Sequence, residues 1–135
     1  MIEGHCFCGF VRFQADGPVS HQTCCHCSTC RRISAAPLVA WLTVPRAKFR
    51  IVSGEPTSFR SSARVTRSFC PRCGTPLTYA NDAADDEIDI TIGSLDEPER
   101  MPPLDHSRVS AQLPWLKLCD GLPNYAEART KQACS

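Results

Sequence analysis

The chain of 135 residues is long enough for one domain but too short for two separate hydrophobic cores. Its hydrophobic fraction of 42% allows a packed interior, yet no segment approaches the ~20 consecutive apolar residues of a membrane span. The formal net charge is +1 and the only basic cluster is the pair Arg31 and Arg32, which argues against nucleic-acid binding through phosphate neutralisation.

Short segments with strand character follow one another along the chain, separated by prolines and glycines at intervals too short for long helices. Apolar and polar residues alternate in four of them, which predicts half-buried strands over residues 10–14, 48–52, 64–69 and 87–92. A fifth segment, residues 37–44, is a continuous apolar run of strand length. Helical turns are expected only near residues 28–32 and 96–101. We predict a mainly β protein with one domain over residues 1–127 and a polar tail over residues 128–135.

The cysteines determine the class of protein. Seven of the ten are arranged in C-x-C or C-x-x-C pairs. The sequence does not begin with the basic and then apolar segments of a secretory signal, so we expect a cytoplasmic location. Thiols one or two residues apart converge on a metal ion more readily than they form unstrained disulfides with distant partners. We therefore predict metal binding and not a disulfide framework.

The pair Cys70 and Cys73, followed by Gly74, has the spacing of a zinc knuckle. Both sulfurs of such a turn point to one ion, and a glycine lets the backbone adopt a positive φ. A structural zinc needs four ligands, so two more must come from elsewhere. The candidates are the pair Cys6 and Cys8 and the group Cys25, Cys27 and Cys30, and spacing alone does not choose between them.

If Cys6 and Cys8 complete that site, Cys25, Cys27 and Cys30 remain as an isolated trio. Three protein ligands and an open position are typical of a reactive zinc site. Three thiolates also leave the ion electron-rich and a weak activator of water, so the site favours binding of an external thiol as the fourth ligand. A fourth protein ligand would instead close the site, and the candidates for that role are Cys24, His26, His106 and Cys119.

Arg31 directly follows the trio. Next to an anionic metal site its planar guanidinium could bind a substrate carboxylate, although a pair such as Arg31 and Arg32 is more often simply solvated.

The sequence resembles the family of glutathione-dependent formaldehyde-activating enzymes, also called the centromere protein V/GFA family. Three ordered cysteine motifs carry most of the resemblance: Cys6-Phe7-Cys8-Gly9-Phe10-Val11, Cys25-His26-Cys27-Ser28-Thr29-Cys30-Arg31-Arg32 and Arg67-Ser68-Phe69-Cys70-Pro71-Arg72-Cys73-Gly74-Thr75-Pro76-Leu77. Further matches are Gly93-Ser94-Leu95-Asp96, His106, Trp115 and Asp120-Gly121-Leu122-Pro123-Asn124-Tyr125. Ala35 and Gln112 depart from the family pattern, in which glycine and lysine are common at these places.

The resemblance implies an Mss4-like, or β-tent, fold of short antiparallel sheets. It implies a structural zinc held by Cys6, Cys8, Cys70 and Cys73. It also implies a catalytic zinc held by Cys25, Cys27 and Cys30, which makes two zinc ions per chain. The implied activity is that of a carbon–sulfur lyase, which joins glutathione and formaldehyde into S-hydroxymethylglutathione.

Two functions of different classes follow. One is a zinc enzyme acting on thiol–aldehyde adducts, with a small thiol and an aldehyde as partners. The alternative is a zinc-stabilised binding or scaffold domain without turnover. Binding of a thiol at the metal held by Cys25, Cys27 and Cys30 distinguishes the two.

Overall fold

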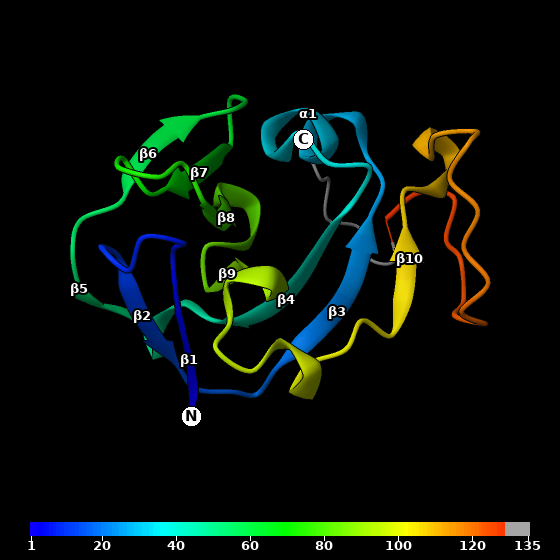
Figure 1. Cartoon of the computed structure of the whole chain (residues 1–135). Coiled ribbons are helices and arrows are strands. Elements are labelled where there is room, and N and C mark those ends of the chain that lie inside the picture. The colour runs from blue at the N-terminus through cyan, green and yellow to red at the C-terminus, as the bar shows by residue number, and fades with distance from the viewer. Residues whose placement is uncertain (129–135) are drawn as a thin grey trace.

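The computed structural model describes residues 1–128; residues 129–135, which make up most of the expected tail and include Cys134, lie outside the described residues. The described chain forms two β-sheets (Figure 1). A three-stranded antiparallel sheet has the order β1-β2-β5, with bounds Ile2–His5, Arg12–Ala15 and Phe49–Ser53. A seven-stranded sheet has the order β10-β3-β4-β9-β8-β7-β6, with bounds Asp105–Ser107, Ser20–Cys25, Val39–Pro45, Glu87–Thr91, Pro76–Asn81, Val65–Phe69 and Thr57–Arg60.

Helical structure is confined to short pieces within the described residues. The α-helix α1 (Ser28–Ser34) lies at the top of Figure 1, between β3 and the β7–β8 hairpin. It ends at Ala35, whose φ of 50° places an alanine in the left-handed region that favours glycine. The remaining pieces are 3-10 turns at Arg46–Lys48, Asp82–Ala84, Ile92–Ser94, Pro98–Arg100 and Val109–Ala111. None of the helices described here is long and apolar enough to cross a membrane.

The mainly β prediction is confirmed, and each of the five predicted strands overlaps an observed one. The strand predicted at residues 10–14 begins only at Arg12, because Phe10 still belongs to the turn that follows the first cysteine pair. The expected antiparallel sheets are present, with one parallel pair of strands in addition. The edge strand β10 runs parallel to β3, with His106 opposite Cys24. This arrangement brings the segment after residue 104 alongside the strand that leads into the second cysteine motif.

The two faces of the seven-stranded sheet are covered differently. One face packs against the small sheet around a core of Phe13, Leu42, Val44, Leu77 and Ile90, with Cys6 and Cys70 at its margin. The other face carries α1, and the core there consists of Val39, Trp41, Val65 and Tyr79 together with Cys25, Cys27 and Cys30. Both faces of the central strands are therefore buried, so a polar residue in these strands can lie in the interior.

One row of residues on the α1 side is polar across four strands. Arg67 of β7 lies opposite Tyr79 of β8, Tyr79 lies opposite Asp89 of β9, and Asp89 lies opposite Thr43 of β4. Residues directly opposite one another in a sheet project to the same face, so these four side chains form a continuous line. Arg67 and Thr43 are only 2% exposed.

Candidate metal centres

Cys6, Cys8, Cys70 and Cys73 form a four-cysteine cluster whose Sγ atoms all lie within 4.8 Å of one another. The Cys6 and Cys8 sulfurs are 3.6 Å apart, and the Cys8 and Cys70 sulfurs are 3.8 Å apart. A tetrahedral zinc with Zn–S bonds of about 2.3 Å would separate its sulfurs by about 3.8 Å. The cluster therefore fits a closed four-thiolate metal site that joins β1 to the β7–β8 turn.

Two turns of the same geometry present these sulfurs. In the first, the Gly9 amide donates to the Cys6 carbonyl at 3.0 Å; in the second, the Gly74 amide donates to the Cys70 carbonyl at 2.9 Å. Gly9 has a φ of 80° and Gly74 a φ of 81°, so both turns use the left-handed conformation expected of Gly74. In each turn the first sulfur also accepts a backbone N–H at 3.3 Å, from Val11 and Arg72 respectively.

Thr75 adds polarity to this cluster. Its Oγ1 accepts the Phe7 amide at 3.0 Å, which leaves its hydroxyl hydrogen to be donated to the Cys73 sulfur at 3.3 Å. Together with the Thr75 backbone, this hydrogen bond lowers the pKa of Cys73 to about 5. These hydrogen bonds favour the thiolate form of Cys73, whereas burial and the neighbouring cysteines raise the pKa of Cys8 to about 11 and a metal ion would have to displace its proton.

Cys25, Cys27 and Cys30 form a three-cysteine cluster, with sulfurs also within 4.8 Å of one another and all three side chains buried. Cys25 ends β3, and Cys27 is the N-cap of α1 with extended backbone angles. The Cys27 sulfur accepts the backbone N–H of Cys30 at 3.2 Å, so the same atom caps the helix and faces the cluster. The short helix is therefore built around the three sulfurs.

None of the candidates for a fourth protein ligand joins the three-cysteine cluster among the described residues. Cys119 is exposed, and the neighbouring Cys24 is buried separately. Burial, with help from Asp120 and Asp105, raises the pKa of Cys24 to about 11 and keeps it a neutral thiol. In the part of the chain that the structure describes, the cluster offers three ligands.

His26 and His106 are instead joined to each other. His26 Nε2 lies 2.9 Å from His106 Nδ1, and His106 Nε2 lies 2.7 Å from the Asp120 carboxylate. Since a carboxylate only accepts, a neutral His106 donates from Nε2 and accepts the His26 proton at Nδ1. Burial, followed by the neighbouring His106, lowers the pKa of His26, and the His106 hydrogen bond lowers that of Asp120.

This chain of three side chains was not predicted from the sequence, in which His106 is a lone histidine. It connects the fully buried ring between Cys25 and Cys27 to Asp120, a half-exposed carboxylate at the surface. The sequence signal for this chain is that His106 and Asp120 both match the family pattern, which does not indicate that they are partners.

Two arginines lie next to the three-cysteine cluster. Arg31, on α1, has a buried Nε without a hydrogen-bond partner among the described residues, whereas Arg32 is exposed. Arg67 is buried beneath the cluster, and both of its terminal nitrogens lie 3.8 Å from the Cys30 sulfur. In the sequence Arg67 is one residue of the third family motif and is not predicted to have a role of its own. Its contact with the Cys30 sulfur makes it part of the three-cysteine site.

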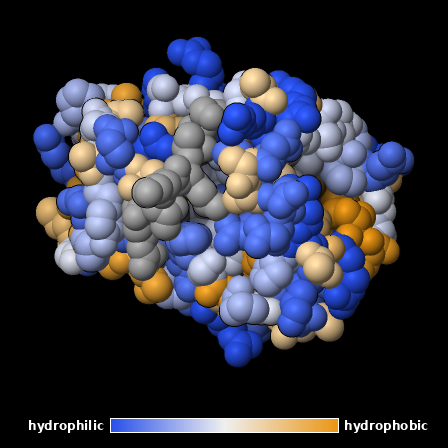
Figure 2. Space-filling view, turned by 180° about the vertical axis from the view of Figure 1, so that it is seen from behind, coloured by the Kyte–Doolittle hydropathy of each residue, from blue (hydrophilic) through white to orange (hydrophobic). Residues whose placement is uncertain are grey.

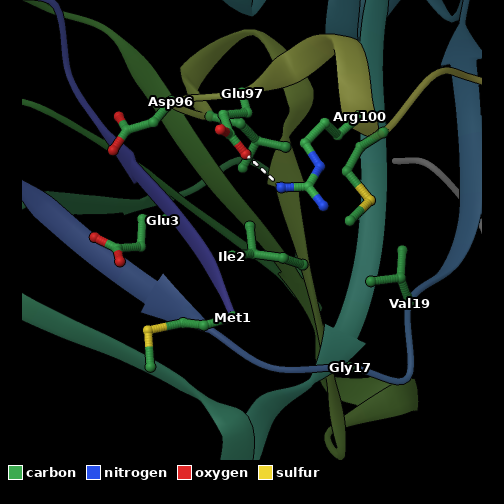
Figure 3. Close-up of a pocket in the computed structure, with 10 residues that line it drawn as sticks. Met1, Ile2, Glu3, Gly17, Val19, Asp96, Glu97 and Arg100 are labelled. Atoms are coloured by element: carbon green, nitrogen blue, oxygen red, sulfur yellow. Dashed lines mark hydrogen bonds and ion pairs between the residues drawn. The ribbon is translucent and has the colours of Figure 1, made fainter.

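A separate depression of about 630 Å³ lies beside the N-terminus (Figure 3). Its lining includes Met1, Ile2 and Val19, and on one side of it Arg100 forms an ion pair with Glu97 of the same turn at 2.9 Å. None of the seven clustered cysteines lines it. Seen from behind the view of Figure 1, the surface is largely hydrophilic, with a hydrophobic patch toward one edge (Figure 2). The two cysteine clusters therefore remain the candidate chemical sites.

Comparison with known proteins identifies the family. The family model described as "Glutathione-dependent formaldehyde-activating enzyme" (GFA) matches residues 1–111. A relative from Schizosaccharomyces pombe, described as an uncharacterised lyase, is 32% identical over 79 residues, which are 58% of this chain and 56% of the relative. The chain thus spans about half the length of that curated relative.

A crystal structure of a Rhodobacter sphaeroides protein superposes with a TM-score of 0.61 at 19% identity, covering 91% of this chain and 98% of that one. At this identity the likeness concerns the fold alone. The family match covers most of the chain and includes both cysteine clusters. The chain belongs to the GFA family of glutathione-dependent formaldehyde-activating enzymes.

Proposed function

We propose that the chain is a zinc-dependent carbon–sulfur lyase acting on thiol–aldehyde adducts, with glutathione and formaldehyde as the model pair. One observation carries the proposal: three buried cysteine sulfurs converge, and no other described residue joins them as a fourth ligand. Membership of the GFA family supports the reaction class. A cytoplasmic location, where thiols stay reduced, is part of the proposal.

The four-cysteine cluster would hold a structural zinc. Its sulfur separations match a closed tetrahedral site, and it joins segments that are far apart in the sequence. The three-cysteine cluster would hold a second, catalytic zinc. When bound, that zinc would supply a coordination position at which an external thiol is held as its thiolate.

The residues around the three-cysteine cluster suit an anionic thiol. Arg31 lies one residue after Cys30, and we assign its guanidinium to a carboxylate of the thiol substrate. In the reaction, the thiol sulfur bonds to the carbonyl carbon and the π electron pair moves to the carbonyl oxygen. That oxygen takes up the proton that the thiol has lost, so thiol and aldehyde give the hydroxymethyl thioether without a further reactant.

The domain would comprise residues 1–127. The described segment after β10 returns along that strand: the His106 amide donates to the Pro123 carbonyl at 2.9 Å, and the Arg108 amide donates to the Glu127 carbonyl at 3.1 Å. Residues 128–135 would be a tail that the metal sites do not need.

Cobalt substitution tests the catalytic assignment, because thiolate–cobalt charge transfer is visible where zinc is silent. Glutathione should increase the charge-transfer absorption by one further sulfur ligand and saturate. Arg31→Ala should weaken glutathione binding but leave binding of the small uncharged thiol 2-mercaptoethanol unchanged, and Arg32→Ala, one residue further and exposed, is the matched control. No spectral change with either thiol would refute the enzyme proposal and favour the zinc-stabilised scaffold.

A further inference from the structure

Arg67 is an arginine whose guanidinium is removed from water. The side chain is 2% exposed, and its Nε donates to Ser61 Oγ at 3.0 Å. Its Nη1 and Nη2 both lie 3.8 Å from the Cys30 sulfur, and its Cζ lies 4.9 Å from the centre of the Tyr79 ring. A buried guanidinium is costly unless a negative charge balances it.

The contacts of Arg67 show where that negative charge must be. Among residues 1–128, its hydrogen bonds and ring contact go to a sulfur, a hydroxyl and an aromatic face, and it forms no ion pair with a carboxylate. The nearest acid on its row, Asp89, is separated from it by Tyr79. Burial raises the pKa of Asp89 to about 7 although the charge of Arg67 opposes this rise, so near neutral pH the Asp89 carboxyl balances Arg67 only in part. The three-cysteine cluster is therefore the anion that Arg67 faces.

The charges of the occupied cluster match this arrangement. Three thiolates around a divalent zinc leave one net negative charge, which the single charge of Arg67 balances. A thiolate entering as fourth ligand brings a second negative charge into the same buried volume. Without Arg67 that charge would enter a centre that is already anionic and shielded from water, where like charges repel strongly.

We propose that Arg67 is a positioning residue that holds the Cys30 sulfur and supplies the positive charge that lets the three-cysteine centre accept an external thiolate. This inference rests on the proposed function. Arg67 acts through Cys30 and not on the remainder of the thiol, so its effect is the same for charged and uncharged thiols. Arg31, by contrast, acts only on thiols that carry a carboxylate.

The contact also changes the electrons of the Cys30 sulfur. An N–H group and a positive charge directed at a thiolate lower the energy of the sulfur lone pairs and weaken their donation to the metal. Removing them raises the lone-pair energy, so sulfur-to-cobalt charge transfer then needs less energy. A spectroscopic signature therefore reports the contact even in the absence of any thiol.

The test uses cobalt-loaded protein with Arg67→Gln and Arg67→Lys, and Arg60→Gln as the matched control. Arg60 is an exposed arginine on the neighbouring strand β6, in an ion pair with Asp82. Two measurements establish that each variant is folded: far-UV circular dichroism, and an unchanged contribution of the four-cysteine cluster to the cobalt absorption. Arg67→Gln should move the charge-transfer band to longer wavelength and weaken glutathione and 2-mercaptoethanol alike, by about 10–100-fold.

Arg67→Lys keeps the charge but loses the planar fork, so it should show a smaller shift of the charge-transfer band and a smaller loss of thiol affinity than Arg67→Gln. If Arg67→Gln does not fold, Arg67→Lys provides the test. A band and thiol affinities equal to those of the wild type in either folded variant would overturn the inference. If wild-type protein binds no thiol, the proposed function fails, while the band position without thiol still tests the Arg67 contact.

Discussion

Asp89 makes the stability of the protein depend on pH in an unusual direction. Its side chain is half-buried on the seven-stranded sheet, and its carboxyl accepts a hydrogen bond from Thr43 at 2.7 Å. Burial raises its pKa from 3.8 to about 7, an effect that the Thr43 hydrogen bond only partly offsets. The folded state therefore binds this proton more tightly than the unfolded state, so the contribution of Asp89 to stability is greatest below pH ~4 and is lost as the pH rises to about 7.

The magnitude follows from the shift. About three pKa units correspond to about 4 kcal/mol over the whole pH range, and the part that falls between pH 5.5 and pH 8.5 is about 2 kcal/mol. This window avoids the acid range in which protons compete with metal for thiolates. Asp89→Asn removes the titration and keeps an oxygen that can accept from Thr43. Relative to wild type, its free energy of unfolding should therefore increase by about 2 kcal/mol from pH 5.5 to pH 8.5.

Thermal melts of metal-loaded protein at several pH values measure this difference. For a chain of this size, about 2 kcal/mol corresponds to a change of about 6 °C in the Tm difference between Asp89→Asn and wild type. Asp85→Asn, an exposed carboxylate in the turn before β9, is the matched control and should show no such trend. A Tm difference that is constant with pH would refute the reasoning, because it would mean that Asp89 titrates alike in the folded and unfolded states.

Four further outcomes are expected. Elemental analysis of protein kept away from chelators should give two zinc ions per chain, and a reproducible value of one after zinc is added back would contradict the two-site arrangement. Cys73→Ala should prevent soluble folding, because structural zinc sites contribute about 10–16 kcal/mol in finger peptides, whereas Cys30→Ala should fold with a weakened second metal; equal melting of the two would contradict the division of roles. His106→Phe leaves the buried His26 Nε2 without an acceptor and should cost about 1–3 kcal/mol in denaturant unfolding, and a free energy of unfolding equal to that of the wild type would contradict the pairing of the two rings. Removal of residues 128–135 should leave metal content and Tm unchanged, and a loss of either would place the domain boundary further along the chain.

The strands that could be predicted are those with a clear hydrophobic pattern. Residues 87–92 alternate between apolar and polar, and residues 37–44 form a continuous apolar run of strand length; both patterns predict strands, and the two segments are the central strands β9 and β4. Two of the strands without a prediction, β6 and β3, carry no such pattern. β6 is exposed throughout, and β3 reads as polar until its final cysteines, so both depend on neighbours that only the fold supplies.

The cysteine clusters show the limit of spacing as evidence. Spacing predicts that Cys70 and Cys73 share an ion, but the partner pair is chosen by the fold, which places the turn after β1 beside the turn between β7 and β8. In the structure Cys6 and Cys8 complete that cluster, which leaves Cys25, Cys27 and Cys30 as a group. The roles of the two groups as structural and catalytic zinc sites remain proposals that the experiments above address.

The roles of Arg67 and Asp89 could not be predicted, because alternation of apolar and polar residues predicts a strand with one buried and one solvent-exposed face. Charged residues are then expected on the solvent-exposed face. Val65 and Arg67 are two residues apart and therefore share a face, and Val65 is fully buried. An arginine on the apolar side of an alternating strand was the available signal. An arginine in such a position indicates a negatively charged group in the interior. Here that group is the three-cysteine cluster, and the sequence alone does not show that the cluster lies beside Arg67.

The four-cysteine cluster also has a consequence for biosynthesis. Its two halves are separated by 62 residues between Cys8 and Cys70. At ribosomal rates of about 5–20 residues per second, the first pair of thiols waits about 3–12 seconds before the second pair has been made. During that interval the N-terminal thiols have no metal site to enter and are open to oxidation or to capture of the wrong ion. Zinc supply and reducing conditions during translation, more than the stability of the finished protein, should therefore set the yield of native chains.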